Sequence, residues 1–157
     1  EPTGGVDPVT RQDFWQLIGK AVVEEGLTVL VSTPYMDEAS RCNRVGFMNY
    51  GRLLAEGTPQ SLTAPLNGRI LELVGTPRRL VRETAVQVPG VEDVQAFGHT
   101  FLLRLRPGAL AEVRDRLPAA LTAAGAAIER LEPAAPLLED AFIELLIADG
   151  GEVRIKD

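Results

Sequence analysis

The spacing of hydrophobic residues changes within the first third of the chain, and each spacing predicts a different element. After residue 7, hydrophobic residues recur every three or four positions, as on one face of a helix, at Phe14, Leu17, Ile18, Ala21 and Val22. Asp7-Pro8 predicts the start of this helix, with the aspartate as its cap, and Gly26 predicts its end. Residues 27–31 are an unbroken apolar run, which predicts a strand buried on both faces in a parallel sheet.

The following segment predicts a β-hairpin between two short helical pieces. The predicted elements are a short helix at 36–41, strands at 45–49 and 52–56, and a helical turn at 57–62. Tyr50-Gly51 predicts the tight turn of the hairpin. Asp37 and Glu38 are expected to cap the short helix or to lie in solvent, because no further ligand with metal-binding spacing follows them.

The chain divides near residues 64–68, and the pattern after this point predicts a second, smaller domain. Its predicted elements are strands at 69–74, 91–97, 100–106 and 126–131, helices at 76–84 and 109–124, and a final helix at 136–148. Pro118 is expected to kink or divide the second of these helices. The order βαββαβ followed by a helix is the split βαβ, or ferredoxin-like, arrangement.

Composition and charge narrow the class of protein. The chain has 157 residues, of which 45% are hydrophobic, so it is long enough for one domain or two small ones with a buried core. A net charge of −6 argues against nucleic acid as a partner. The single cysteine, Cys42, excludes an internal disulfide and supplies no metal cluster. No apolar run approaches the roughly 18 residues that span a bilayer, so a soluble, reducing compartment is expected.

Three segments of the first 63 residues carry a resemblance to a known family. They read Glu-Pro-Thr-Gly-Gly-Val-Asp-Pro at 1–8, Thr-Val-Leu-Val-Ser-Thr-Pro-Tyr-Met-Asp-Glu-Ala-Ser-Arg-Cys at 28–42, and Arg-Val-Gly-Phe-Met-Asn-Tyr-Gly-Arg-Leu-Leu-Ala-Glu-Gly-Thr-Pro at 44–59. In this order and spacing they resemble the catalytic turn, the switch strand and loop, and the closing hairpin of ABC transporter ATPases. The Tyr-Met-Asp-Glu-Ala pattern is most similar to that of multidrug and drug-resistance exporters.

The resemblance implies a fold and a division into domains. The chain is expected to be an α/β fragment of an ABC ATPase core followed by a small α+β ferredoxin-like accessory domain. Residues 1–63 would be the C-terminal piece of the nucleotide-binding domain, residues 64–148 the accessory domain, and residues 149–157 a tail. Accessory domains of this pattern occur at the C-terminus of drug-exporter ATPases, and Leu-Leu-Glu-Asp-Ala-Phe at 137–142 is similar to their terminal helix.

The resemblance also implies roles for residues at the start of the chain. Glu1 matches the catalytic glutamate that polarises the attacking water. Gly4, Gly5, Val6 and Asp7 match the turn that crosses the interface between two ATPase subunits. Asp7 leads directly into a helix, whose N-terminus is suited to face an anion.

Pro34 departs from the family pattern at the switch loop. The family places a histidine there, whose imidazole contacts the γ-phosphate, and proline has neither a side-chain donor nor a backbone N–H to replace it. The hypothesis is that the parent ATPase has a slow or degenerate nucleotide site. The alternative is that Pro34 only kinks a loop whose neighbours compensate.

Motifs that the family needs for nucleotide binding are absent from the sequence. It contains no Gly-x-x-x-x-Gly-Lys-Ser/Thr phosphate loop and no Leu-Ser-Gly-Gly signature. ATP and Mg²⁺ are therefore expected in the full-length parent, whereas no bound cofactor, metal or ATPase activity is expected of this chain alone. The unpaired apolar run at 27–31 is expected to make the chain self-associate through residues 1–33.

The parent protein would lie at the inner, cytoplasmic face of the cell membrane, with a membrane-spanning transporter subunit and a second ATPase subunit as partners. Two other classes of function stay open for the C-terminal half. It could be a regulatory module that senses a small ligand, or a coupling module that holds subunits together without catalysis of its own. Coupling is favoured, because the sequence shows no convergent set of polar residues for a ligand.

Overall fold

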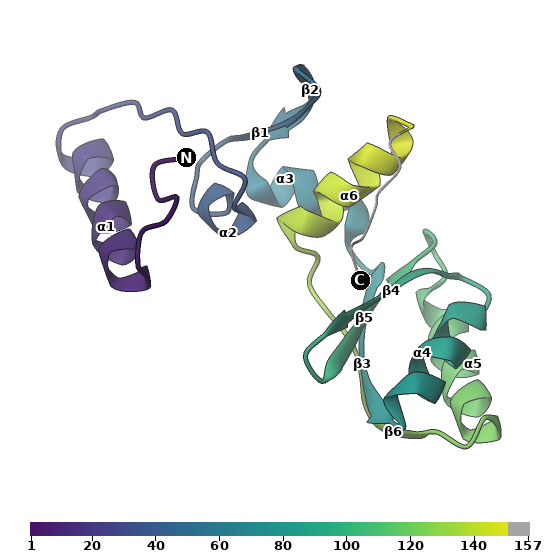
Figure 1. Ribbon diagram of the computed structural model, residues 1–157. Coiled ribbons are helices and arrows are strands. Elements are labelled where there is room, and N and C mark those ends of the chain that lie inside the picture. Colours follow the sequence, from purple (N-terminus) through teal and green to yellow (C-terminus); the bar gives the residue numbers. More distant parts are fainter. Residues whose placement is uncertain (151–157) are drawn as a thin grey trace. The chain divides into compact units, whose positions relative to one another are not determined.

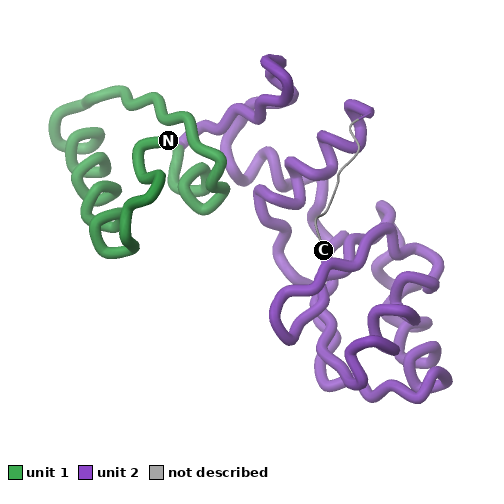
Figure 2. Tube along the Cα trace, in the orientation of Figure 1, with its two compact units in different colours: residues 1–42 green, residues 43–157 purple. Residues whose placement is uncertain are grey.

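The computed structural model describes residues 1–150, so the last part of the expected tail, residues 151–157, lies outside the described residues. Contacts divide the chain into two compact units, residues 1–42 and residues 43–157 (Figure 2). The domain boundary expected at residues 63 and 64 lies within the second unit, and it stays a prediction about domain organisation.

The first unit contains two helices. Helix α1 spans Pro8–Glu24 and helix α2 spans Met36–Ala39. The predicted cap of α1 is confirmed, because Asp7 Oδ1 accepts hydrogen bonds from the backbone N–H groups of Val9 and Thr10 at 3.0 and 3.1 Å. The predicted end is confirmed as well, since Gly26 follows the helix with a φ of 66°.

The strand predicted at residues 27–31 is wrong. Residues 27–33 form no helix or strand, and the side chain of Leu30 is 98% exposed. A strand forms only where a neighbouring strand supplies hydrogen-bond partners. No strand occurs among residues 1–42, so the apolar run has no sheet to join.

The second unit begins with the predicted hairpin. Strands β1 (Val45–Asn49) and β2 (Arg52–Gly57) pair antiparallel. Tyr50 and Gly51 both have positive φ, at 44° and 75°, as the tight two-residue turn of a hairpin requires. Helix α3 (Pro59–Thr63), the 3₁₀ turn η1 (Ala64–Leu66) and helix α6 (Leu138–Ala148) pack nearby (Figure 1).

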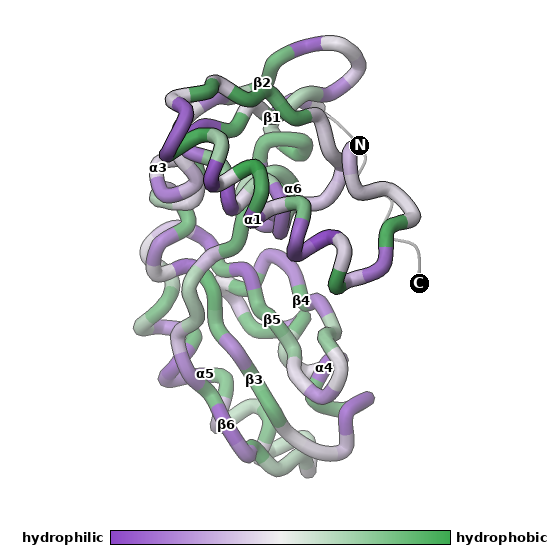
Figure 3. Tube along the Cα trace, turned by 90° about the vertical axis from the view of Figure 1, so that its left-hand side faces the viewer, coloured by the Kyte–Doolittle hydropathy of each residue, from purple (hydrophilic) through white to green (hydrophobic). Residues whose placement is uncertain are grey.

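A four-stranded antiparallel sheet forms the rest of the second unit. Its strands are β3 (Ile70–Thr76), β4 (Val91–Phe97), β5 (Thr100–Leu105) and β6 (Ala127–Pro133), in the spatial order β4-β5-β3-β6. Helices α4 (Arg78–Gln87) and α5 (Leu110–Ala123) cover one face (Figure 1). Hydrophobic residues occupy most positions of β3 and β5 (Figure 3).

The core of this sheet follows the alternation of its strands. Leu71 and Leu73 of β3 lie opposite Leu103 and Phe101 of β5, and all four side chains are buried toward the helices. Helix α5 adds buried side chains from successive turns: Val113, Leu117 and Leu121. Pro118 does not divide α5 as expected, because the helix continues through it to Ala123.

Charged residues link helix α6 to the four-stranded sheet. The ion-pair quartet consists of Arg69, Arg104, Glu92 and Glu144. Arg69 donates to Glu144 of α6 at 2.8 Å and to Glu92 of β4 at 3.0 Å. Removing one partner of a buried ion pair costs about 3–5 kcal/mol, and the partial exposure of the two carboxylates lowers that cost here. The quartet therefore holds α6 against the sheet.

The chain is thus a mixed α/β protein with antiparallel sheets. The predicted elements of the second unit are confirmed in type and order, with boundaries displaced by a few residues. For example, α4 runs three residues beyond the predicted end at 84, and β6 runs two residues beyond 131.

Candidate functional site

The residues that the sequence singles out lie on two short segments of the first unit. Glu1, Gly4, Gly5, Val6 and Asp7 belong to the N-terminal turn, which we define as residues 1–7. Pro34 belongs to the switch loop, which we define as residues 32–35. Their roles in catalysis stay predictions, and the structure describes the local geometry of each segment.

Backbone hydrogen bonds fold the N-terminal turn tightly. The N–H of Gly4 donates to the carbonyl oxygen of Glu1 at 3.5 Å, and the N–H of Val6 donates to that of Thr3 at 3.1 Å. Gly5 has a φ of 73°, which favours glycine at this position. The side chain of Glu1 is exposed, so its carboxylate is accessible from solvent.

Asp7 closes the N-terminal turn and opens α1. The hydroxyl and the backbone N–H of Thr10 hold the pKa of the Asp7 carboxyl below its ordinary value, and the N–H of Val9 adds to this effect. Asp7 is therefore ionised at neutral pH and fixed by the helix that it caps. Its exposed carboxylate lies at the end of the predicted interface turn.

The switch loop is ordered by a local hydrogen bond beside Pro34. Thr33 Oγ1 accepts from the backbone N–H of Tyr35 at 3.1 Å, and α2 begins at the next residue. Pro34 itself is exposed and, as a proline, donates no hydrogen bond. The position at which the resemblance implies a histidine is thus presented to solvent.

A buried carboxylate joins the two segments. Glu38 of α2 has no exposed surface, and its two oxygens accept from different parts of the chain. Oε1 accepts from the hydroxyl of Thr3, in the N-terminal turn. Oε2 accepts from the hydroxyl of Thr33, in the switch loop, at 2.7 Å. We call these two hydrogen bonds the carboxylate link.

Helix α1 supplies the counter-charge for the carboxylate link. Arg11 Nε lies 4.0 Å from Glu38 Oε1, and the Arg11 guanidinium stacks over the ring of Tyr35 at 5.3 Å. Burial raises the pKa of the Glu38 carboxyl, but the hydroxyls of Thr3 and Thr33 and the charge of Arg11 together lower it below the usual value. Glu38 is therefore a buried anion at neutral pH.

The expectation that Glu38 caps α2 or lies in solvent is wrong. Its side chain makes no capping bond at the start of α2 and is fully buried. Nor does the sequence single out Thr3, which is 1% exposed. The sequence gives only a weak signal for this contact. Glu38 lies in a short helix and the two threonines lie in separate turns, and only the fold brings the three residues together.

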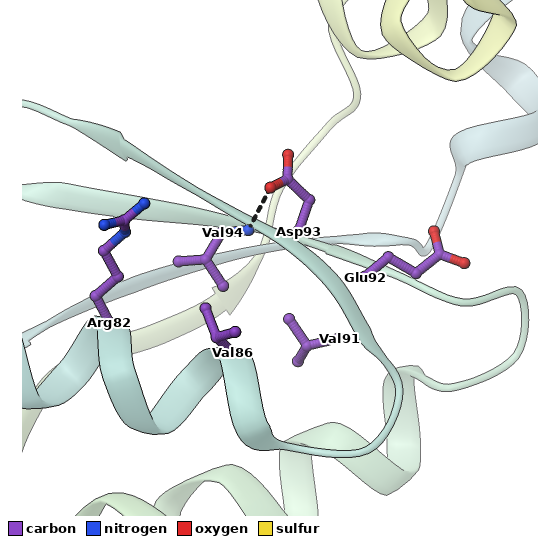
Figure 4. Close-up of a pocket in the computed structure, with 6 residues that line it drawn as sticks. All are labelled: Arg82, Val86, Val91, Glu92, Asp93 and Val94. Carbon is purple, nitrogen blue, oxygen red and sulfur yellow. Dashed lines mark hydrogen bonds between the residues drawn. The ribbon is translucent and has the colours of Figure 1, made fainter. Parts of the chain in front are cut away.

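The described residues offer no metal centre. Among residues 1–150, no three or more His, Cys, Asp or Glu side chains group as they would around a metal ion. A shallow depression between α4 and β4 is lined by Arg82, Val86, Val91, Glu92, Asp93 and Val94 (Figure 4). Its charged groups do not converge, because Glu92 points away from Arg82 (Figure 4) and pairs instead with Arg69.

Fold and site together define a mixed α/β protein whose candidate site is built from a turn and a loop joined by a buried carboxylate. No protein-family model matches the chain. None of the helices within residues 1–150 has both the length and the apolar character needed to cross a bilayer.

Comparison with curated proteins shows the family. The probable multidrug ABC transporter ATP-binding protein YbhF of Escherichia coli is 35% identical over 150 residues, which cover 93% of this chain and 24% of the relative. The Nod factor export ATP-binding protein I of Cupriavidus metallidurans is 33% identical over 156 residues, or 98% of this chain and 47% of the relative. The daunorubicin/doxorubicin resistance ATP-binding protein DrrA of Streptomyces peucetius is 40% identical over 74 residues, or 46% of this chain and 22% of the relative.

The chain belongs to the family of ABC transporter ATP-binding proteins. It spans less than half of the length of these relatives, between 22% and 47%.

Proposed function

We propose that this chain is the C-terminal part of an ATP-hydrolysing subunit that powers export of a substrate across a membrane. The observation that carries the proposal is the alignment of nearly the whole chain with ATP-binding proteins named for a multidrug transporter and for Nod factor export. The longer protein would associate with a membrane-spanning subunit and a second ATPase subunit at the inner face of the cell membrane. ATP turnover by that longer protein is the measurement that tests the proposal.

In this proposal, the N-terminal turn carries the chemistry. Glu1 orients and polarises the water that attacks the γ-phosphate, and Gly4 to Asp7 cross the interface to the second subunit. The exposure of Glu1 and the fixed, ionised state of Asp7 support these roles. ATP and Mg²⁺ would be held by other parts of the longer protein, since the sequence contains no phosphate loop and residues 1–150 offer no metal cluster.

We further propose that residues 64–148 form a ferredoxin-like accessory domain. The element order βαββαβ and the strand order β4-β5-β3-β6 support this assignment. A coupling role that holds subunits together is favoured over ligand sensing, because the depression beside α4 is shallow and its charged groups do not converge (Figure 4).

The isolated chain should neither bind ATP at micromolar concentrations nor hydrolyse it. Without a phosphate loop, no set of backbone N–H groups can surround the β- and γ-phosphates. Titration of residues 1–157 with a fluorescent ATP analogue should give no saturable signal, and the longer protein should bind in the same assay. Micromolar ATP binding by residues 1–157 would contradict the proposal that other parts of the longer protein hold the nucleotide.

The isolated chain should also self-associate through residues 1–33. Leu27, Val29 and Leu30 lie outside any helix or strand and are exposed, so they present apolar surface and a segment without strand pairing to a second copy. Light scattering over a range of concentrations should detect dimers or larger species. Leu30→Lys should shift the chain toward monomer, whereas Val86→Lys on α4 serves as the matched control. A wild-type monomer at every concentration would refute this expectation.

A further inference from the structure

We infer that Glu38 is a positioning residue, which sets the rate of ATP hydrolysis by holding the N-terminal turn and the switch loop in register through the carboxylate link. The inference rests on the proposed function, because it concerns how fast the same site works. Glu38 does not act on the nucleotide itself, since its carboxylate is fully buried.

The first step of the argument is the use of both carboxylate oxygens. Oε1 accepts from Thr3 and Oε2 from Thr33, so one rigid planar group contacts both segments. A buried carboxylate must receive hydrogen bonds or a counter-charge, because an unsatisfied buried charge is costly. Here the threonine hydroxyls donate these hydrogen bonds and the Arg11 guanidinium supplies the counter-charge. If either threonine moved away, one oxygen of the buried carboxylate would lose its hydrogen bond.

The second step is the distance along the chain from each threonine to a predicted functional residue. Thr3 is two residues from Glu1, and its carbonyl oxygen accepts from Val6 within the interface turn. Thr33 is adjacent to Pro34, and its hydroxyl also accepts from the N–H of Tyr35. A shift of either threonine therefore moves the position expected to face the nucleotide. A misplacement of about 1 Å can cost about a hundredfold in rate.

The third step separates Glu38 from the charged residue beside it. Asp37 precedes Glu38 in α2, but its side chain is 58% exposed and its nearest cation, Arg11, lies 3.9 Å away. Asp37 contacts neither the N-terminal turn nor the switch loop through any hydrogen bond among the described residues. A substitution at Asp37 changes the charge of α2 equally and leaves the carboxylate link intact, which makes it the matched control.

The test in the longer ATP-binding protein compares Glu38→Gln with Asp37→Asn. Glutamine keeps the shape of the side chain but has one acceptor oxygen in place of two. We expect kcat to fall by about tenfold to hundredfold in Glu38→Gln while KM for ATP changes by less than about twofold, and no change in Asp37→Asn. Thr3→Val and Thr33→Val should each reproduce the fall, and Thr3→Ser and Thr33→Ser should restore kcat because they keep the hydroxyl.

A second measurement on residues 1–157 does not depend on ATP turnover. Thr33→Val, a substitution in the switch loop, should speed amide hydrogen exchange at Gly4 and Val6 in the N-terminal turn, because it loosens Glu38 and through it Thr3. Exchange within α1 at Ile18 should stay unchanged as an internal control. If Glu38→Gln fails to fold, Thr33→Val in both measurements carries the test.

The outcomes separate this inference from the proposed function. A longer protein without ATP turnover in the wild type would overturn the proposed function and the role of Glu38 together. An active wild type whose Glu38→Gln and Thr33→Val variants keep the same kcat would overturn the positioning role alone. Equal losses of kcat and of ATP affinity, or unchanged exchange at Gly4 and Val6 in Thr33→Val, would also reject it, because they indicate general destabilisation or no link between the segments.

Discussion

Replacing Glu1 with glutamine in the longer protein should lower ATP turnover by about a hundredfold or more. A positioned general base contributes about 10²–10⁴-fold to a rate, and glutamine cannot accept a proton from the attacking water. The substitution should be structurally mild. The Glu1 side chain is exposed, and the turn around it is held by the backbone, from Gly4 N–H to Glu1 C=O. ATP binding should therefore remain, so that the loss appears in kcat.

Measuring steady-state ATP hydrolysis and equilibrium ATP binding in parallel distinguishes a loss of kcat from a loss of ATP affinity. Glu25→Gln is the matched control, because Glu25 is also an exposed carboxylate and lies at the opposite end of α1. Turnover in Glu1→Gln within about threefold of the wild type would show that another group activates the water. The assignment of the N-terminal turn as the catalytic turn would then fail.

Replacing Pro34 with histidine should raise ATP turnover of the longer protein by about tenfold to hundredfold. A hydrogen bond to a charged group contributes about 1.5–3 kcal/mol, and if it forms mainly in the transition state this energy appears in the rate. Pro34 is exposed and follows Thr33, whose hydroxyl is already bound to Glu38 and to the Tyr35 N–H. The loop is therefore held beside this position without help from the proline ring.

The decisive comparison uses three proteins: the wild type, Pro34→His and Pro34→Ala. Alanine removes the conformational restriction of proline but supplies no imidazole, so it tests the alternative in which Pro34 merely kinks the loop. Turnover should rise in the histidine variant only, and Glu1→Gln should abolish the gain. Equal turnover in all three proteins, with nucleotide binding intact, would remove the hypothesis of a degenerate site.

Local signals in the sequence were sufficient for most of the elements. The Tyr50-Gly51 turn, the Asp7 cap and the Gly26 end are each decided by one or two residues whose backbone preferences are strong, and the structure has all three. The apolar alternation around Leu71 and Leu103 likewise predicts strands, because their neighbours in the sheet lie within the same unit.

Tertiary partners decided the rest. The apolar run ending at Val31 has the composition of a buried strand, but strand formation depends on a neighbouring strand that residues 1–42 do not supply. Pro118 predicts a break, yet α5 is held on both sides of it by Leu117 and Leu121 in the core. Glutamate is usually a surface residue, and Glu38 is buried only because Thr3, Thr33 and Arg11 converge on it.

Helix α6 connects the hairpin and the sheet of the second unit. Its Phe142 ring lies 5.2 Å from the Phe47 ring of the hairpin, and two residues later its Glu144 carboxylate binds Arg69 at the start of the sheet. The same short helix thus contacts segments that lie 95 and 75 residues earlier in the chain. Unfolding of the hairpin would remove contacts of α6, and loss of α6 would remove contacts of the sheet. We therefore expect the hairpin and the sheet to melt in a single step.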